Sequence, residues 1–300
     1  MRKKQFWAAM AALACIMWGI SGLFAKSLFM VSKNITPLWL TQIRMIVSGV
    51  ILILTAAALK QKPFACLKTD WKTLVAYGLL GLLPVQLFYF IVVQQANASI
   101  ATVLQFCGPF IVMAYMVARH KQVLRWLDVL AALGAFAGVF LLATHGDVSH
   151  LALTPAVLFW GLLSAIGVAT NTLIPIKILQ RVPSLVVTGW GMLFAGVALF
   201  LIHPQFASVP NTPRVWIDVL GVIIIGTLIP FQLMMNSLRF ILPSTATLLD
   251  AFEPLSATIG SVICFGLVMT PWDITGSVLV VISTLALNVR IPHKKAKKHR

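Results

Sequence analysis

The chain has 300 residues, of which 60% are hydrophobic and only 10% are charged, and its mean hydropathy is +0.96. This composition leaves too little polar surface to cover a water-soluble globule, so it excludes a soluble protein and predicts one embedded in a lipid bilayer. The net charge of +16 resembles that of nucleic-acid-binding proteins, but the distribution of the basic residues gives another explanation.

Ten apolar runs are long enough to cross a membrane as helices, which need about 20 residues each. Strands are excluded because membrane-spanning strands alternate in polarity and are about half as long. In chain order the predicted spans are 7–29, 37–59, 74–93, 98–118, 127–144, 153–173, 185–202, 215–240, 245–268 and 274–289. The first run is too long for a signal peptide, so we expect it to be retained as a helix.

Basic residues mark one side of this membrane. If the amino terminus is cytoplasmic, the outer loops contain only Lys33 and Arg214, and the other loop lysines and arginines are cytoplasmic. This bias follows the positive-inside rule for an even number of spans. We therefore predict a multi-pass protein of the inner or plasma membrane with both termini in the cytoplasm. The basic tail at 291–300 is expected to contact anionic lipid head groups rather than nucleic acid.

The two halves of the chain repeat each other. LPVQL at 83–87 recurs as IPFQL at 229–233, SIATVL at 99–104 recurs as STATLL at 244–249, and each half has a proline downstream, Pro109 and Pro254. Five spans in each half give the two copies opposite orientations in the membrane, as in secondary transporters. We expect two inverted five-helix repeats, 1–146 and 147–290, followed by the tail. Both prolines are predicted to act as helix hinges.

Motifs for catalysis or for cofactor binding are absent from the sequence. There is no HExxH, GxGD, GxSxG or GxxxxGK[ST] motif, and the six histidines and four cysteines have no metal-binding or redox spacing. We therefore expect no cofactor, no metal and no ATP-driven step. Transport by this chain is expected to be passive or coupled to an ion or solute gradient.

Polar and aromatic side chains at mid-span depth are the candidates for a substrate site. Singly, each is more often packing than ligand, but residues of this kind from both halves together predict a polar cavity between the halves. The predicted cavity residues are Trp18, Gln86, Tyr89, Gln105, Asn171, Trp190, Gln232 and Asn236.

Three charged residues lie deep in the spans, where burial of a charge costs ~2.5–3.5 kcal/mol. Asp250 and Glu253 are one helical turn apart on one helix face. They form either a structural pair with Arg44 or Arg239, or a proton or cation site, which we favour because two such carboxylates are not expected to be charged together. For Arg44 we favour a carboxylate or carbonyl partner over direct substrate contact.

Several of these segments resemble EamA-type members of the drug/metabolite transporter superfamily. They are ACIMWG at 14–19, QIR at 42–44, SIATVLQ at 99–105 with Pro109, and STATLL at 244–249 with FEP at 252–254. The resemblance covers 7–289 and includes Glu253 in its most specific motif. It implies a basket of ten helices, with a cavity lined by helices one to four and six to nine and with helices five and ten at the periphery.

The sequence departs from the family pattern in three places. Gly108 precedes Pro109 where an acidic or small polar residue is also common, Asp250 is not part of the pattern, and the basic run 119–121 replaces an acidic residue at the end of the fourth helix. These departures concern substrate and coupling rather than fold.

The function predicted from the sequence is secondary transport of a small organic solute, namely an amino acid, metabolite or drug-like compound, with export by alternating access. The alternatives are a membrane-embedded lipid-modifying enzyme or flippase subunit, for which Asp250 and Glu253 are the candidate reactive pair, and a scaffold or receptor subunit. A scaffold gives no reason for polar groups in both halves.

Overall fold

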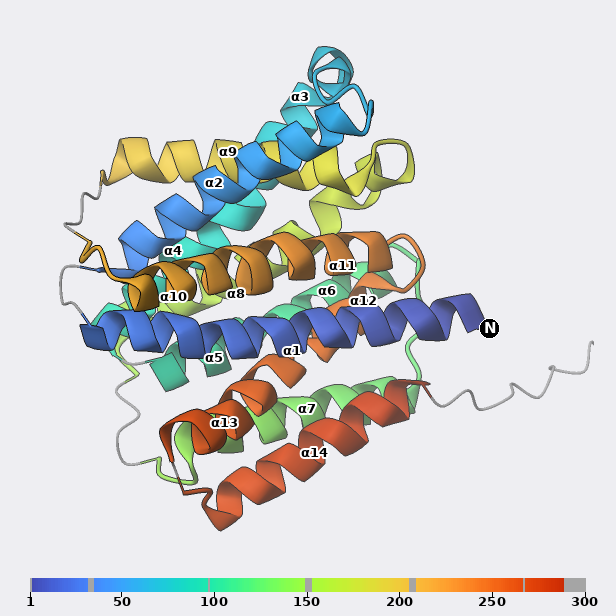
Figure 1. The fold of residues 1–300 in the computed structure, drawn as a ribbon. Coiled ribbons are helices and arrows are strands. Elements are labelled where there is room, and N and C mark those ends of the chain that lie inside the picture. Colours follow the sequence, from blue (N-terminus) through green and yellow to red (C-terminus); the bar gives the residue numbers. More distant parts are fainter. Residues whose placement is uncertain are drawn as a thin grey trace, which may run out of the picture.

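A computed structural model describes residues 2–31, 35–96, 98–148, 153–204, 209–266 and 268–288. The regular elements in these ranges are helical (Figure 1). The α-helices are α1 (Arg2–Val31), α2 (Pro37–Ala58), α3 (Ala65–Ala76), α4 (Leu83–Gln95), α5 (Ala98–Gln105), α6 (Gly108–Ala118), α7 (Trp126–Thr144), α8 (Pro155–Leu173), α9 (Ser184–Ile202), α10 (Pro213–Ile223), α11 (Ile229–Ser237), α12 (Pro243–Leu249), α13 (Phe252–Phe265) and α14 (Pro271–Asn288). Short segments of other helix types adjoin some of these α-helices. The segments η1 (Tyr77–Leu82) and η4 (Ile224–Leu228) are π-helical, and η2 (Ile174–Ile176) and η3 (Ile178–Gln180) are 3₁₀-helical.

The ten predicted spans are all present as helices. Among the described residues, 9 helical stretches are long and apolar enough to cross a membrane, and α14 adds a shorter apolar helix over Pro271–Ala286. Two spans are composite, since α3, η1 and α4 form the third and α10, η4 and α11 form the eighth. The all-helical membrane class is confirmed.

The third span begins at Ala65, earlier than the predicted residue 74. The polar residues Lys68, Asp70 and Lys72 lower the hydropathy of this first part, which hid it from the sequence analysis. Asp70 is nevertheless buried at 5% exposure, because it forms an ion pair with Arg181. An internal partner therefore lets the helix extend into the interface.

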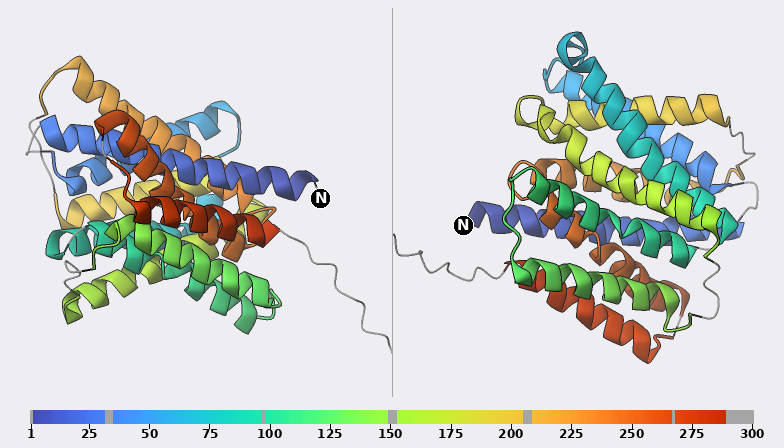
Figure 2. Two further views of the ribbon diagram at one scale, coloured as in Figure 1. Left: turned by 90° about the horizontal axis from the view of Figure 1, so that it is seen from below. Right: turned by 180° about the vertical axis from the view of Figure 1, so that it is seen from behind.

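The two halves have opposite orientations. We call the end of the molecule where α1 begins the N end, and the end where α1 finishes the far end. The first helix of the second half, α8, begins at the far end and runs toward the N end (Figures 1 and 2). The repeats are therefore inverted, as the odd number of spans in each half predicts.

Local backbone irregularities also repeat between the halves. A π-helical turn precedes Pro84 and another precedes Pro230. Proline lacks an N–H and its ring crowds the preceding turn, which a wider turn accommodates. The fourth and ninth spans are both interrupted ahead of a proline, between α5 and α6 before Pro109 and between α12 and α13 before Pro254. The duplicated sequence thus produces duplicated backbone features.

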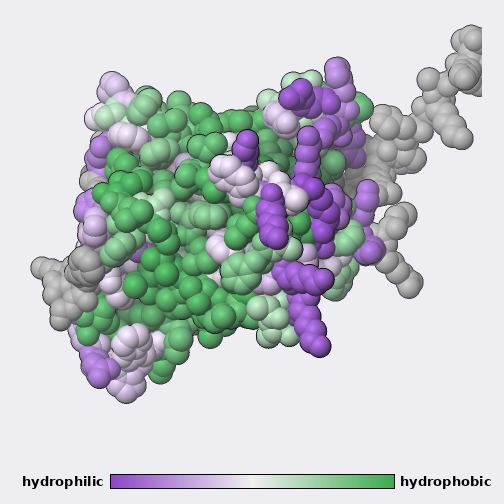
Figure 3. Space-filling view, turned by 90° about the horizontal axis from the view of Figure 1, so that it is seen from above, coloured by the Kyte–Doolittle hydropathy of each residue, from purple (hydrophilic) through white to green (hydrophobic). Residues whose placement is uncertain are grey.

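Hydrophilic side chains gather mainly at the N end, and a broad hydrophobic surface covers the middle (Figure 3). Helix ends and loops at the N end contain the basic residues Lys60, Lys62, Lys68, Lys72, Arg119, Lys121, Arg125, Lys177, Arg181 and Arg239. The predicted basic tail at 291–300 lies outside the described residues. Assignment of the N end to the cytoplasm remains a prediction.

Helices α7 and α14, the fifth and tenth spans, pack against each other at one edge of the molecule (Figure 1). Glycines allow this close approach: a Cβ added to Gly138 would lie 2.8 Å from the carbonyl oxygen of Gly276, and one added to Gly276 would lie 2.8 Å from that of Gly138. Small residues are the usual means of close helix contact in membranes. The pair lies at the periphery, as the family resemblance implied.

Candidate functional site

A cavity of about 660 Å³ lies between the two halves. Its lining comes from α1, α2, α4, α5, α8 and α10 to α13, and reaches Met30, Pro37 and Val93 at the far end. Thr247 and Asp250 line the inner end of the cavity, at mid-depth in the molecule. The cavity therefore faces the far end, and its size falls in the range of roughly 300–1,000 Å³ found for small-molecule sites. Among the described residues, the seventh span, α9, contributes nothing to the lining, although the family resemblance implied that it would.

Eight of the eleven sequence-predicted cavity and charge-pair residues line this space. They are Trp18, Arg44, Gln86, Tyr89, Gln105, Asn171, Asp250 and Glu253. The indole of Trp18 packs edge-on against Phe231 from the second half, with ring centroids 5.1 Å apart. The lining thus combines aromatic rings, amides and charges from both repeats.

Arg44 extends from α2 into the cavity, and its guanidinium donates a hydrogen bond to the amide oxygen of Gln86 on α4. An amide is a neutral partner, so this contact orients the guanidinium without neutralising its charge. The cation at this wall remains available to an anionic group, because a guanidinium has five N–H donors and the hydrogen bond to Gln86 uses one of them.

Gln105 connects α5 with α4 and with α8, and Tyr89 connects α4 with α5. The Gln105 amide donates hydrogen bonds to the Val85 carbonyl at 3.0 Å and to the Ser164 hydroxyl at 2.8 Å. The Tyr89 hydroxyl lies 3.3 Å from the Thr102 hydroxyl. The buried amide oxygen of Asn171 has no hydrogen-bond partner among the described residues. Asn171 is therefore the amide with the most capacity for a ligand.

The two carboxylates differ in their surroundings. Asp250 is partly buried at the interruption between α12 and α13, and accepts a hydrogen bond from the Cys15 thiol at 3.3 Å. Glu253, in the first turn of α13, has an exposed side chain that faces the cavity. Within the described part of the chain, its carboxylate has neither a hydrogen bond nor an ion pair. Arg239, an alternative partner, instead donates to the Val182 carbonyl at 2.8 Å.

Three predicted cavity residues lie elsewhere. Trp190 donates from its indole N–H to the Pro63 carbonyl at 2.9 Å, next to the ring of Phe64. Gln232 accepts a hydrogen bond from the Ser184 hydroxyl at 2.8 Å, and Asn236 donates to the Gln232 carbonyl at 2.9 Å. All three lie between the cavity and the N end, so the structure does not bring them together with the other eight.

Pro109 and Pro254 each follow an interruption of their span. Turns with i to i−3 hydrogen bonds replace the regular pattern at Cys107, whose amide bonds to the Leu104 carbonyl at 3.1 Å, and at Asp250, whose amide bonds to the Thr247 carbonyl at 3.3 Å. The second interruption holds Asp250 at the cavity. A role for either proline as a hinge stays a prediction.

Sequence reasoning missed several lining residues. Ser21, Thr41 and Thr172 line the cavity, but small hydroxyl residues in membrane helices are so often packing contacts that nothing in the sequence distinguishes them. Lys26 also lines the cavity, and its Nζ lies 4.4 Å from the centroid of the Phe265 ring.

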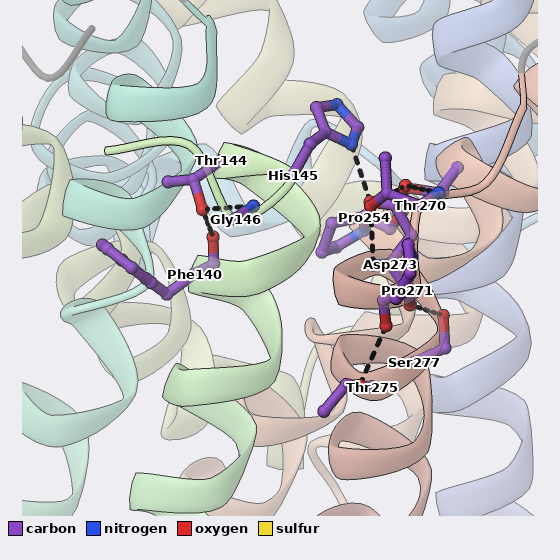
Figure 4. Close-up of polar contacts among 11 residues, drawn as sticks. Phe140, Thr144, His145, Gly146, Pro254, Thr270, Pro271, Asp273, Thr275 and Ser277 are labelled. Carbon is purple, nitrogen blue, oxygen red and sulfur yellow. Dashed lines mark hydrogen bonds and ion pairs between the residues drawn. The ribbon is translucent and has the colours of Figure 1, made fainter. Parts of the chain in front are cut away.

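A second cleft of about 410 Å³ opens beside the first, between α13 and the helices α1, α5, α7 and α14. At its far-end mouth, His145 at the end of α7 is hydrogen-bonded to Asp273 at the start of α14 (Figure 4), and its Nδ1 lies 2.6 Å from Asp273 Oδ1. Asp273 also accepts hydrogen bonds from the backbone N–H and hydroxyl of Thr270, at 2.8 and 2.9 Å. The His145–Asp273 contact joins the two peripheral helices.

No cluster of three or more histidine, cysteine or acidic side chains suited to a metal is found among the described residues.

A model of the EamA-like transporter family matches residues 5–144 and again 155–289. A curated relative, "Uncharacterized inner membrane transporter YicL" of Salmonella typhimurium, is 30% identical over 280 residues, covering 92% of this chain and 93% of the relative. A chain in a solved crystal structure has the same fold, with a TM-score of 0.77 and 19% identity over 94% of this chain and 96% of that one.

Proposed function

Because the chain belongs to the EamA-like transporter family, we propose that it is a secondary transporter that exports a small organic solute across the inner membrane by alternating access. The relative from Salmonella typhimurium is named as an inner membrane transporter, which supports the choice of membrane. A transporter family also removes the enzyme alternative. Lipid flipping remains an outcome that the transport experiment below can detect.

The observation that carries the proposal is the charge arrangement of the cavity. Arg44 supplies a cation on α2, and Asp250 and Glu253 supply carboxylates on the ninth span. Trp18 and Tyr89 add aromatic surface to the lining. A solute with an anionic group for Arg44, a cationic group for Glu253 and an apolar body matches these walls. We infer that amino acids and similar zwitterions are the substrate class.

Contacts at the N end support alternating access, because they close the side opposite to the cavity mouth. The rings of Trp7 and Phe240 stack with centroids 5.1 Å apart, and Ser237 donates to the Trp7 carbonyl at 2.9 Å. Ser244 on α12 donates to the Gln122 amide oxygen at 2.5 Å. Transport requires these contacts to open while the far end closes.

A ligand-stabilisation screen tests the substrate class. The purified protein is heated with free amino acids, with their N-acetyl derivatives and with their amides, which lack the cationic or the anionic group respectively. A zwitterion present at a hundred times its Kd should stabilise the protein by about 2.7 kcal/mol. Arg44→Gln should abolish this effect, and the control Arg214→Gln, an exposed arginine at the far end, should retain it.

Transport is then measured in liposomes that contain the purified protein, with the stabilising solute and with a labelled phospholipid as the alternative cargo. Solute movement that depends on the protein supports the proposal. Stabilisation by the amides alone would contradict the zwitterion class, and phospholipid flipping without solute movement would contradict the proposed function.

A further inference from the structure

Glu253 lies where the second cleft meets the main cavity. The two spaces share five of their lining residues, which are Trp18, Gly22, Lys26, Tyr89 and Glu253. The remaining lining of the cleft belongs to other surfaces, chiefly the ends of α7 and α14 and the face of α13 that includes Thr258 and Ser261. The Glu253 carboxylate is therefore accessible from two directions.

Oxygen atoms line the walls of the cleft. Thr258 and Ser261 lie one turn apart on α13, and Thr102 lies opposite them on α5. The Thr258 hydroxyl donates to the Pro254 carbonyl at 2.9 Å, which leaves its oxygen free to accept from water. These three hydroxyls provide hydrogen-bonding sites for water along walls that also include apolar side chains such as Leu142 and Val262.

Carboxylates lie at both ends of the cleft. Asp273 is at the mouth, where His145 and Thr270 hold its side chain (Figure 4). The Asp273 side chain is 2% exposed, whereas that of His145 is 57% exposed. Glu253 is at the floor with an unpartnered carboxylate in the described part of the chain. Lys26 and His145 also line the cleft, so of its two carboxylates Glu253 is the one without a partner among the described residues and is the proton acceptor at the floor.

The surroundings of Glu253 separate the two paths. The titratable or charged groups near it are Cys15, Lys26, Arg44, Tyr89 and Asp250. Arg44 and Asp250 line the main cavity and not the cleft. A solute in the main cavity can therefore occupy the side of Glu253 that faces Arg44 and leave the cleft side open.

We propose that the second cleft is the path by which a proton reaches Glu253 from the far side of the membrane while the solute occupies the main cavity. A hydronium ion in the cleft transfers its proton to a Glu253 carboxylate oxygen and becomes water, and the proton returns to water when the site opens at the N end. Net, one proton crosses and no other bond changes. This inference rests on the proposed transport function and assigns its coupling path.

Cysteine labelling tests the path without any solute. Glu253→Cys is placed in a protein without other cysteines and treated from the far side with the cationic thiol reagent trimethylammonium-ethyl methanethiosulfonate. Val93→Trp fills the main cavity only, and Ser261→Trp fills the cleft only. Labelling should continue in the Val93→Trp protein and fall at least about tenfold when both fillers are present, because thiol reactivity requires access. Loss of labelling with Val93→Trp alone would overturn the proposal.

A second arm uses the protein with Glu253 intact and the solute from the stabilisation screen. Ser261→Trp should slow proton-linked transport at saturating solute while leaving the stabilisation by that solute unchanged. Val93→Trp should instead weaken the stabilisation. An unchanged rate and pH profile in Ser261→Trp liposomes would also overturn the proposal. Because the labelling arm requires no transport, failure of the proposed function and failure of the path are distinguishable.

Discussion

Among individual residues, Asp250 and Glu253 show how local contacts give two similar carboxylates different roles. They are one helical turn apart, yet the Asp250 carboxylate already accepts a hydrogen bond from Cys15, whereas Glu253 faces the cavity without a partner in the described ranges. Exposure to two water-accessible spaces makes Glu253 the better proton site. Asp250 is better suited to fix the start of α13 and to keep a second negative charge nearby.

We therefore expect Glu253→Gln to abolish the pH dependence of transport or to reduce transport sharply while the protein still folds. Asp250→Asn should have the same effect less severely, because it removes only the neighbouring charge. The measurement is solute transport as a function of pH in liposomes, with Asp147→Asn in the loop after α7 as the control. Uptake and a pH profile like those of the wild type in Glu253→Gln would reduce the two carboxylates to a structural feature.

Among helices, the interruptions before Pro109 and Pro254 are the places where the fourth and ninth spans change direction most readily. Each breaks a span into two parts, α5 with α6 and α12 with α13. Helix α13 has one buried residue, Leu255, and packs closely along α1. A change of direction at the second interruption therefore moves α13 relative to α1.

Pro109→Ala and Pro254→Ala should each reduce the transport rate, because a restored backbone hydrogen bond stiffens the span. The rate is compared at equal amounts of folded protein in the membrane. Pro213→Ala is the matched control, since Pro213 begins α10, where a helix has no hydrogen bond to lose. If both variants express and transport normally, the hinge role is wrong, although the symmetry of the repeats survives.

The helices could be predicted from the sequence, because long apolar runs leave few alternatives in a bilayer. The π-helical turns and the early start at Ala65 were not predicted. The turns depend on how a proline is accommodated, and the early start depends on the contact of Asp70 with Arg181, which is 111 residues away.

The site could be predicted in part, and Gln86 and Gln232 show why. Both occur in the same repeated sequence, but Gln86 lines the cavity and Gln232 does not. The repeats are inverted, so equivalent residues face opposite ends of the molecule. The repeated sequence predicts the same role for both residues, because it does not show at which end of the molecule the cavity opens.

Over the whole molecule, this symmetry predicts the residues of the opposite state. Gln86 lines the cavity, and the repeat places Gln232 at the corresponding position of the second half; Thr188 lies on α9, the second-half counterpart of α2, whose Thr41 lines the cavity. The Thr188 hydroxyl and the Gln232 amide nitrogen are buried and have no hydrogen-bond partner among the described residues. Buried groups of this kind are costly, and an alternative conformation in which they meet solvent or solute offsets that cost.

Gln232→Cys and Thr188→Cys should therefore react with a water-soluble thiol reagent applied from the N end during turnover, and Gln86→Cys and Thr41→Cys from the far end. Solute added in excess should slow all four reactions. Protection of the first-half cysteines alone, with the second-half cysteines unreactive under turnover, would contradict the symmetry-derived site.

Orientation in the membrane is tested by single cysteines at the helix ends. Lys68→Cys in α3 and Lys295→Cys, in the tail outside the described residues, should react only with a reagent on the cytoplasmic side, because basic segments are retained there. Asn211→Cys, before α10 at the far end, should react only from outside. Labelling of Lys68→Cys or Lys295→Cys from outside would exclude the topology of ten spans with both termini in the cytoplasm.

The position of Glu253 along its span has an electrical consequence. Ten residues separate it from Pro243 at the start of α12, and twelve separate it from Phe265 at the end of α13, so its carboxylate lies near the middle of the bilayer. A cation that binds there from the far end crosses roughly half of the transmembrane voltage, worth about 1 kcal/mol for each 100 mV. Occupancy of this carboxylate, and with it the rate of solute movement, should therefore respond to membrane potential even at constant pH.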